Sequence, residues 1–502
     1  MLRFLAMLML CLSVAACGRH PGEAQLRGDV ETALAASFGG DMFRVVDLAR
    51  RGSAADSTAE DGEARRVAYY DVELELMRDL VLGDWDDPGA ASLVTLLGAG
   101  PRSIRGVKAG GNAAGDRIVA HASAIYREDG GRWEFVMPAG FRDAGHPRTE
   151  AGRPLRTSQG ALDTLAEITR TVEAGGSRAA QNVLDQELRR SVARISGRLT
   201  RIEQGYPVAA GRDRGEYAMF AAALAELAQA RQMRIVPLVT AGSEENLELL
   251  RNGSVVAALA QADTAHEAYE GGGPFAGRGA FTSLRALGSL YPEFVHIVVR
   301  SDAGFRTAAD LKNGARIALG PRSSAVRGTL TRVLSAHGLE PGRDYEAIDT
   351  RFVESLAALR RGEVDAIAHV IGMPAAPLRD ALAGRALSLL PLDAGAARRL
   401  AETGEGLIAA SMAPGVYPGQ RERVLTVAVP ALLVTTESLT ADEASRLVRL
   451  VYEAGNDLLA HGSAQGSQVS VGTARRGLTL PLHAGAERAL AELEARAAEA
   501  AR

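Results

Sequence analysis

The stretch from Leu284 to Leu334 reads LRALGSLYPEFVHIVVRSDAGFRTAADLKNGARIALGPRSSAVRGTLTRVL, and its alternating strand and helix signals decide the fold. Val295 to Val299 is rich in β-branched residues, which is typical of a strand buried on both faces. Thr307 stands three residues before Asp310, a capping pattern that predicts a short helix. Ala315 to Leu319 then predicts a second strand.

A polar loop, Gly320 to Ser324, follows this second strand directly, and Ala325 to His337 predicts a helix that ends at Gly338. The N-terminus of a helix carries unpaired N–H groups and a partial positive charge, so it attracts anions. Arg322 and the two serines of the loop are therefore candidates for binding an anionic ligand.

Composition limits the class of protein. A chain of 502 residues is long enough for two or three domains with cores of their own. The formal net charge of -4 argues against a nucleic-acid partner. Only Lys108 and Lys312 among the 57 basic residues are lysines, so a single arginine carries little information.

The first 17 residues have the form of a lipoprotein export signal. Arg3 is followed by an apolar run from Phe4 to Val14, which is too short to span a membrane. Val14-Ala15-Ala16-Cys17 resembles a bacterial lipobox, which implies cleavage before Cys17 and lipid on its sulfur. The alternatives are an uncleaved anchor and plain secretion. Because Cys11 lies in the removed segment, no disulfide is expected within the mature chain.

Residues 18–142 are expected to form a small α+β domain with an antiparallel sheet. Apolar spacing predicts the helices Gln25–Phe38 and Ala90–Leu97, and the strands Phe43–Leu48, Val67–Leu76, Ile118–Tyr126 and Trp133–Val136. Asp129-Gly130-Gly131 is a hairpin signal between the last two strands. No chemistry follows from this domain, and a spacer or docking module is the preferred interpretation.

Residues 143–157 are rich in Gly, Pro and charge without apolar periodicity, which predicts a linker. Residues 158–198 predict two helices separated at Gly175-Gly176. An apolar stripe in the second helix either packs on its own domain or faces a partner.

From Leu199 onward strands and helices alternate, which predicts a mainly parallel sheet with helices on both faces. The predicted strands are Tyr206–Ala210, Ile235–Val239, Val255–Gln261, Val364–Val370, Leu387–Leu390 and Leu425–Val434. The predicted helices are Gly215–Ala230, one with Ser243 as its N-cap, Val353–Arg361, Ala375–Leu382, Ala394–Thr403 and Ala441–His461.

Several short motifs follow one another in a characteristic order: the opening stretch, Gly211–Tyr217, Ala241–Leu247, Gln261–Asp263, Arg361–Ala366, Tyr417–Gly419, Val429–Val434 and Leu482–Ala486. This order resembles the TAXI family, the solute-binding proteins of tripartite ATP-independent periplasmic (TRAP) transporters. The resemblance implies an α/β, two-lobed periplasmic-binding-protein fold of type II-like form after the small α+β domain. It places lobe 1 in residues 199–299 and 425–490, lobe 2 in residues 300–424, and a C-terminal tail in residues 491–502.

Ligands of open α/β sheets bind beyond the carboxyl ends of the strands. Three such ends fall on motifs of the resemblance, and helix N-termini there favour a small organic anion or an amino acid as ligand. The candidate ligand-binding residues are Arg212, Arg214, Tyr217, Thr240, Ser243, Gln261, Arg322, Ser323, Ser324 and His369.

The loops depart from the family pattern, because Arg212, Asp213, Arg214 and Glu216 fill positions that are normally small or hydroxylated. Either the arginines supply guanidinium donors to a ligand, or Arg212 pairs with Asp213 or Glu216 on a solvated rim. Structural roles also remain open for Tyr217, Gln261 and His369.

Catalysis is not supported by the sequence. It has no G-x-S-x-G elbow, no G-x-x-x-x-G-K loop and no H-E-x-x-H pair, and its nine histidines lack metal-ligand spacing. We therefore expect no enzyme activity, no cofactor and no metal.

The resemblance implies an extracytoplasmic protein of the bacterial cell envelope, held on the membrane by lipid on Cys17. It would capture a solute between its lobes and deliver it to an ion-gradient-driven TRAP permease. The alternatives are a ligand-sensing lipoprotein that signals to a membrane receptor, and an envelope-structural lipoprotein whose cleft has decayed. The sequence leaves the choice of inner or outer membrane open.

Overall fold

The computed structural model describes residues 21–56, 64–81, 85, 89–108, 111–130, 132–138, 195–213, 215–322, 324–384, 386–454 and 457–500. The export signal with Cys17, the predicted linker and most of the segment 158–198 lie outside the described residues, as do Arg214 and Ser323. In the part of the chain that is described, no helix combines the length and the apolar character needed to cross a membrane.

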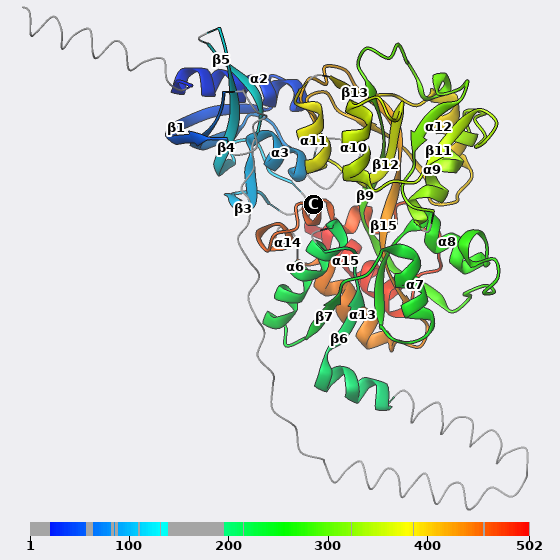
Figure 1. Ribbon diagram of the computed structural model, residues 1–502. Coiled ribbons are helices and arrows are strands. Elements are labelled where there is room, and N and C mark those ends of the chain that lie inside the picture. The colour runs from blue at the N-terminus through cyan, green and yellow to red at the C-terminus, as the bar shows by residue number, and fades with distance from the viewer. Residues whose placement is uncertain are drawn as a thin grey trace, which may run out of the picture.

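An antiparallel sheet of five strands with two helices forms the N-terminal part of the protein (Figure 1). Its strand order is β1-β2-β4-β3, and β5 pairs with β4. The elements are α2 (Glu23–Phe38), β1 (Phe43–Ala55), β2 (Arg65–Leu76), α3 (Ala90–Leu97), β3 (Ala99–Arg105), β4 (Arg117–Asp129) and β5 (Arg132–Pro138). The predicted antiparallel sheet and its hairpin are confirmed. Strand β3 was missed because Gly100 and Pro101 interrupt its pattern.

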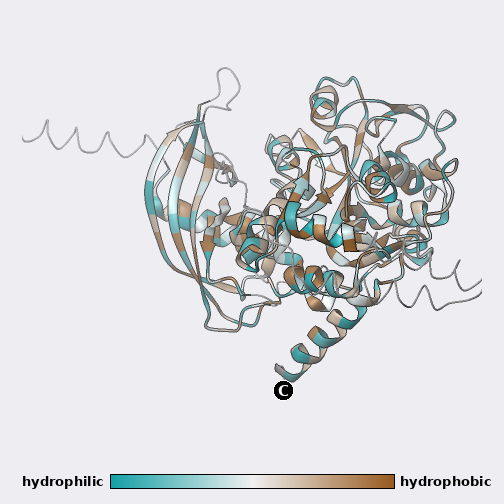
Figure 2. Ribbon diagram, turned by 90° about the horizontal axis from the view of Figure 1, so that it is seen from below, coloured by the Kyte–Doolittle hydropathy of each residue, from teal (hydrophilic) through white to brown (hydrophobic). Residues whose placement is uncertain are grey.

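Alternation along the strands explains how this sheet packs. In β2, Tyr70, Val72 and Leu74 are buried, whereas the residues between them are more exposed. Hydrophilic and hydrophobic residues accordingly alternate along these strands in Figure 2. The buried face forms one core with the apolar stripe of α2, which includes Leu26 and Val30.

The rest of the protein is built on one sheet of ten strands, in the order β11-β10-β12-β9-β15-β8-β6-β7, with β13 beside β9 and β14 beside β15. The strands are β6 (Tyr206–Ala209), β7 (Ile235–Leu238), β8 (Ala257–Gln261), β9 (Leu284–Arg300), β10 (Ala315–Ala318), β11 (Tyr345–Ile348), β12 (Ala366–Gly372), β13 (Leu387–Leu389), β14 (Ile408–Met412) and β15 (Val424–Thr436). Strands β6 to β8 are parallel to one another, and so are β10 to β12. The two parallel groups are the two lobes, which confirms the predicted fold class.

Strands β9 and β15 run through both lobes and connect them (Figure 1). They pair with each other, and at opposite ends of the pair β9 pairs with β12 and β13 of lobe 2 while β15 pairs with β8 of lobe 1. Strand β9 is buried along nearly its whole length and begins at Leu284, well before the predicted start at Val295. Gly288 lies within it at a φ of 149°, and the hydroxyl of Tyr452 passes so close that a Cβ would meet it at 2.1 Å. Glycine is therefore required here because a side chain would clash with Tyr452, and it does not end the strand.

Helices cover the faces of both lobes (Figure 1). They are α6 (Glu216–Ala230), α7 (Ser243–Arg251), α8 (Ala262–Glu270), α9 (Ala325–Ser335), α10 (Phe352–Arg360), α11 (Ala376–Leu382), α12 (Ala394–Glu402), α13 (Ala441–Tyr452), α14 (Asp457–Ala460) and α15 (Ala484–Ala500), with short 3₁₀ turns η1 (Gly273–Phe275), η2 (Ala308–Asp310), η3 (Gln465–Gln468) and η4 (Val471–Thr473). The capping box of Thr307 and Asp310 is confirmed at η2.

Two helix predictions need correction. The predicted helix Ala441–His461 is divided into α13 and α14, and the sequence carries Gly455 between them, a residue that favours helix ends. The N-cap of α7 is Gly242 and not Ser243, whose side chain instead accepts a hydrogen bond from the Gln261 N–H at 3.1 Å.

The N-terminal sheet domain, residues 21–138, contacts one segment of lobe 2 and one segment that packs on lobe 1. We call the two connecting strands, β9 and β15, the hinge. The Ser37 hydroxyl donates to the carbonyl of Pro414, 2.7 Å away, in the segment between β14 and β15. The Trp85 indole donates to the carbonyl of Gln468 at 3.3 Å, in the C-terminal segment that packs on lobe 1. Leu459 of that segment also joins the core of the N-terminal sheet. The domain is thus attached to both lobes.

Candidate functional site

A cavity of about 540 Å³ lies between the two lobes, and we call it the interlobe cleft. It lies at the carboxyl ends of the parallel strands, where a ligand of an open α/β sheet is expected. Its lobe 1 wall is formed by Gly211, Arg212, Gly215, Glu216, Tyr217, Ala241, Gly242, Ser243, Glu244, Glu245, Glu248, Gln261, Arg278 and Glu293 of β9. Its lobe 2 wall is formed by Gly320, Pro321, Ser324, Ala325, Val326, Phe352, His369, Val370 and Ile371.

The structure brings most of the described candidate residues together in this cleft. Those that line it are Arg212, Tyr217, Ser243, Gln261, Ser324 and His369. Arg214 and Ser323 lie outside the described residues.

Thr240 and Arg322 are placed elsewhere, which corrects their predicted position in the site. The Thr240 hydroxyl is buried and donates to Asn246 Oδ1 at 2.6 Å, so the short turn after β7 holds it inside lobe 1. The Arg322 side chain is 83% exposed, and its Nε donates to Asp349 Oδ2 at 2.5 Å. Both side chains are thus engaged within their own lobe.

Tyr217 and Gln261 surround a carboxyl group that the sequence analysis missed. Tyr217 is 8% exposed, and its hydroxyl donates to Glu293 Oε2 at 2.9 Å. The Gln261 side chain lies close enough to lower the pKa of the same carboxyl by hydrogen bonding. The signal was present in the sequence, since Glu293 is the one charged residue in the run from Leu287 to Val299.

Burial changes the protonation of two cleft carboxyls. It raises the pKa of Glu293 to about 8, against the opposing hydrogen bonds from Tyr217 and Gln261. It also raises the pKa of Glu216, the first residue of α6, to about 7. The charge of Glu216 raises the pKa of Glu293 further, so the two groups are neighbours. At neutral pH Glu293 is therefore mostly protonated, and Glu216 is divided between its protonated and ionised forms.

His369 contributes a neutral ring to the lobe 2 wall. Its imidazole stacks on the ring of Phe352 with centroids 4.1 Å apart and an interplanar angle of 13°. Burial lowers the pKa of His369 to about 4, and the charge of Arg212 lowers it too. The ring therefore carries no charge at neutral pH.

The helix ends that face the cleft differ in their own charges. Helices α6 and α7 begin with acidic residues, and the Ala241 N–H before α7 donates to Glu245 Oε2. Helix α9 has no acidic residue in its first turn, and Ser324 makes no side-chain cap. The N-terminus of α9 is therefore the one best able to receive an anionic group. On lobe 1, Arg278 is already paired with Glu248 at 3.0 Å.

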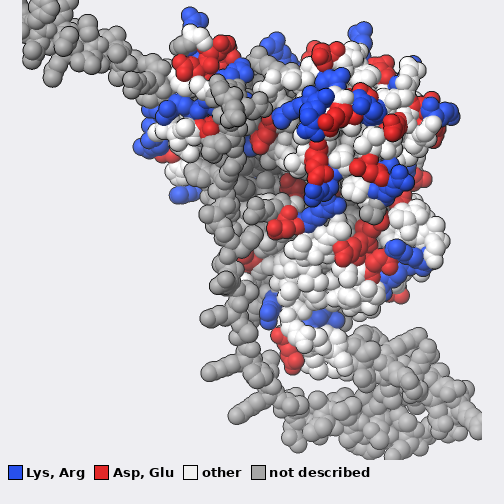
Figure 3. All heavy atoms as spheres, viewed as in Figure 1, with Lys and Arg blue, Asp and Glu red and all other residues white. Residues whose placement is uncertain are grey.

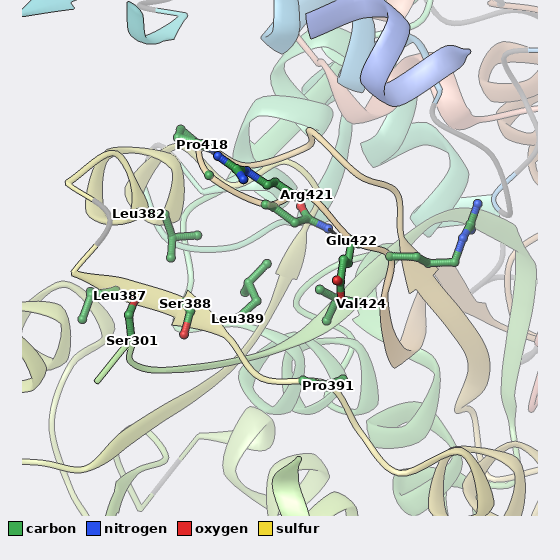
Figure 4. A pocket seen from close by; sticks show the side chains of 13 residues that line it. Ser301, Leu382, Leu387, Ser388, Leu389, Pro391, Pro418, Arg421, Glu422 and Val424 are labelled. Atoms are coloured by element: carbon green, nitrogen blue, oxygen red, sulfur yellow. Dashed lines mark hydrogen bonds between the residues drawn. The ribbon is translucent and has the colours of Figure 1, made fainter. Parts of the chain in front are cut away.

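A second hollow of about 490 Å³ lies on lobe 2 and shares no lining residue with the interlobe cleft. Figure 4 shows the β13 residues Leu387, Ser388 and Leu389 on one side and the loop residues Arg421 and Glu422 on the other. We assign it no ligand. Over the face of the protein shown in Figure 3, acidic and basic side chains are interspersed. Among the described residues, no three His, Cys, Asp or Glu side chains gather in a way that would hold a metal ion.

Comparison with known proteins identifies a family. The sequence profile of the NMT1-like family matches residues 208–493, which contain both lobes. Among solved structures, the aliphatic sulphonate binding protein SsuA from Escherichia coli is 18% identical, with 49% of this chain and 69% of that chain covered and a TM-score of 0.33.

Two further solved structures have similarly low sequence identities and TM-scores. XAC2383 from Xanthomonas citri bound to ATP is 14% identical, with 58% and 95% covered and a TM-score of 0.36. A periplasmic binding protein from Brucella ovis with glutathione bound is 13% identical, with 51% and 70% covered and a TM-score of 0.32. At these scores we take the fold from the strand order of the chain itself, which is that of a periplasmic-binding-protein-like α/β fold behind a separate antiparallel sheet.

Proposed function

The chain belongs to the NMT1-like family, and from this premise we propose that it is an extracytoplasmic solute-binding protein that encloses its ligand between two lobes. The observation that carries the proposal is the interlobe cleft, which receives polar and buried side chains from both lobes. Its volume suits a small organic solute.

Ligand capture in this proposal is a shift of population between open and closed forms. Strands β9 and β15 are the connections about which the lobes move. A ligand that contacts both walls stabilises the closed form by as much as it binds that form better. The residues proposed to contact it are Arg212, Tyr217, Ser243, Gln261, Ser324 and His369.

The proposed ligand class is a small organic anion or an amino acid. The open N-terminus of α9 and the guanidinium of Arg212 support an anionic group on the ligand. The test is a thermal-shift titration of the protein, begun at Gly18, with dicarboxylates, oxoacids, sulfonates and amino acids. A ligand at a hundred times its Kd adds about 2.7 kcal/mol of stability. No stabilisation by any of these solutes would count against the proposal.

Delivery to a TRAP permease, with energy from an ion gradient, is proposed from the order of the TAXI-like motifs. Lipid attachment at Cys17 would hold the protein on the outer face of a bacterial membrane. Fractionation of cells that carry the chain or its Cys17→Ser variant tests the anchor. The wild type is expected in the membrane fraction and the variant in the soluble periplasmic fraction.

A second candidate function is ligand sensing, and the N-terminal sheet domain favours it. This domain contacts the segment at Pro414 and the segment at Gln468, so it is placed to register their relative movement. A membrane receptor that binds the protein only with ligand present would support sensing. Ligand uptake that is lost on deletion of the gene would support transport.

A further inference from the structure

We propose that the ligand carries a protonated amine, which binds at the carboxyl groups of Glu216 and Glu293 on the lobe 1 wall of the interlobe cleft. This inference rests on the proposed solute-binding function and narrows its ligand class to amine-bearing solutes. Compounds that carry only anionic groups, such as dicarboxylates and sulfonates, are disfavoured by the same wall.

The first support is the position of the two carboxyls. Glu293 comes from the connecting strand β9 and is 7% exposed, yet it lines the cavity. Glu216 comes from the start of α6 and is half-buried on the same wall. Both groups that donate to Glu293, the Tyr217 hydroxyl and the Gln261 amide, are uncharged.

The second support is the lack of a compensating cation. Among the described residues, neither Glu216 nor Glu293 forms an ion pair, although the chain is rich in arginine. The remaining acidic neighbour, Asp263, is already bound by Arg332 at 2.6 Å and by Thr329. Buried carboxylates without a cation cost free energy, and they keep a proton instead. An ammonium group supplies both the missing charge and up to three donors.

The opposite wall is compatible with a cation. The stacked rings of Phe352 and His369 line lobe 2, and an aromatic face attracts a cation. His369 is neutral because burial lowers its pKa to about 4, so it does not repel an amine. Of the two arginines among the described residues that line the cleft, Arg278 pairs with Glu248 and Arg212 has no carboxylate partner at salt-bridge distance, so Arg212 can pair with an acidic end of the ligand.

Protonation of Glu216 and Glu293 should make the affinity for an amine depend on pH. The titratable groups whose charge interacts with the two carboxyls are Tyr217, Tyr291, Tyr417 and Asp263, and burial raises the pKa values of the three tyrosines well above the ordinary range. The pKa values of Glu216 and Glu293, about 7 and about 8, fall within the range from pH 6 to 8. Because an ammonium group pairs with ionised carboxylates, its affinity rises with pH across this window. The affinity of a purely anionic ligand falls.

The experiment is isothermal titration calorimetry at pH 6, 7 and 8 with matched probes. The amine probes are glutamate, lysine and putrescine, and the probes without an amine are 2-hydroxyglutarate and succinate. We expect at least one amine probe to bind, and to bind about tenfold more weakly to Glu216→Gln and to Glu293→Gln. The pH dependence should flatten in both variants. Glu422→Gln, at the second hollow, is the matched control and should behave as the wild type.

Each other outcome overturns a distinct claim. Tight binding of succinate or 2-hydroxyglutarate, unchanged in both variants and stronger at pH 6, would overturn the amine site but leave the solute-binding function intact. Binding of no probe at any pH, together with no stabilisation across the wider solute panel, would overturn the proposed function itself. If Glu293→Gln does not fold, Glu216→Gln decides the result, because Glu216 is only half-buried at the start of its helix.

Discussion

The two walls of the interlobe cleft have the same architecture but differ in charged side chains, which among the described residues line only the lobe 1 wall. Both present loops at the carboxyl ends of parallel strands, and both direct helix N-termini toward the cavity. The lobe 1 wall carries five carboxyl groups, those of Glu216, Glu244, Glu245, Glu248 and Glu293. Among its described residues, the lobe 2 wall carries no acidic group. The fold thus determines where a ligand lies, whereas a few side chains determine which charge it has.

The largest expected effect comes from truncating an aromatic residue on each wall. Tyr217→Ala removes a buried ring and leaves Glu293 without its donor, so the free energy of unfolding should fall by about 3–5 kcal/mol. Phe352 is only half-buried and stacks on His369, so Phe352→Ala should lower the free energy of unfolding by clearly less than Tyr217→Ala does. Urea denaturation of both variants measures the difference. Equal losses would mean that the half-buried Phe352 ring contributes as much to stability as the buried Tyr217 ring.

The next effect concerns pH. The pKa of Glu293 is raised in the folded state to about 8 from an ordinary 4.5, so the folded protein holds a proton that the unfolded chain has released. Stability therefore falls as pH rises toward 8. Below pH 6.5 the depressed pKa values of His296 and His369 oppose this trend, so the window from pH 6.5 to 8 is the informative one.

Across that window the difference in stability between the wild type and Glu293→Gln should change by about 2 kcal/mol, in favour of the variant at higher pH. Chemical denaturation at pH 6.5, 7.2 and 8 provides the measurement. A constant difference would show that Glu293 is already ionised in the folded protein.

A smaller effect is expected when a helix of lobe 2 receives an acidic first turn like those of α6 and α7 in lobe 1. Ala325→Asp adds an acidic residue to the first turn of α9, which has none. The charge should stabilise the helix by about 0.3–1 kcal/mol. The substitution should also lower the affinity for any ligand whose anionic group lies at this helix end. Thermal unfolding with and without ligand separates the two effects, and tighter ligand binding in the variant would refute an anionic contact at α9.

The smallest effect is expected from Arg322→Ala. The guanidinium pairs with Asp349 in an exposed position outside the cleft lining, and exposed pairs contribute little to stability. Neither the melting temperature nor the ligand affinity should change measurably. Arg212→Ala, which alters the lobe 1 rim of the cleft itself, is the matched comparison and should reduce the affinity for an acidic ligand.

Much of the fold could be predicted because its signals are local. The run that became β9, the capping box at η2 and the hairpin between β4 and β5 depend on residues that are close in sequence. Strand β14 was missed because Ile408 to Met412 acquires its strand form by pairing with β15, across the chain. Pairing of that kind is decided by tertiary contacts and not by local preference.

The positions of the candidate residues could be predicted better than their neighbours. Strand ends mark the cleft, so six of the candidate residues were found by position. The expected donor Arg322 is paired outside the cleft, and Glu293 was missed because it looks from sequence like an isolated charge in a strand. A side chain's direction and its neighbours depend on the assembled lobes, and no spacing rule supplies them.

The N-terminal sheet domain adds a thermodynamic consequence to this two-lobed design. It holds Pro414 on one side of the hinge through Ser37, and the C-terminal segment on the other side through Trp85. If the lobes move as proposed, the contacts of this domain with both lobes are expected to change as well. In the proposed mechanism the free energy of these contacts is part of the equilibrium between open and closed forms, and thus of the apparent Kd for the solute. Residues that never touch the solute can in this way set how tightly it is held.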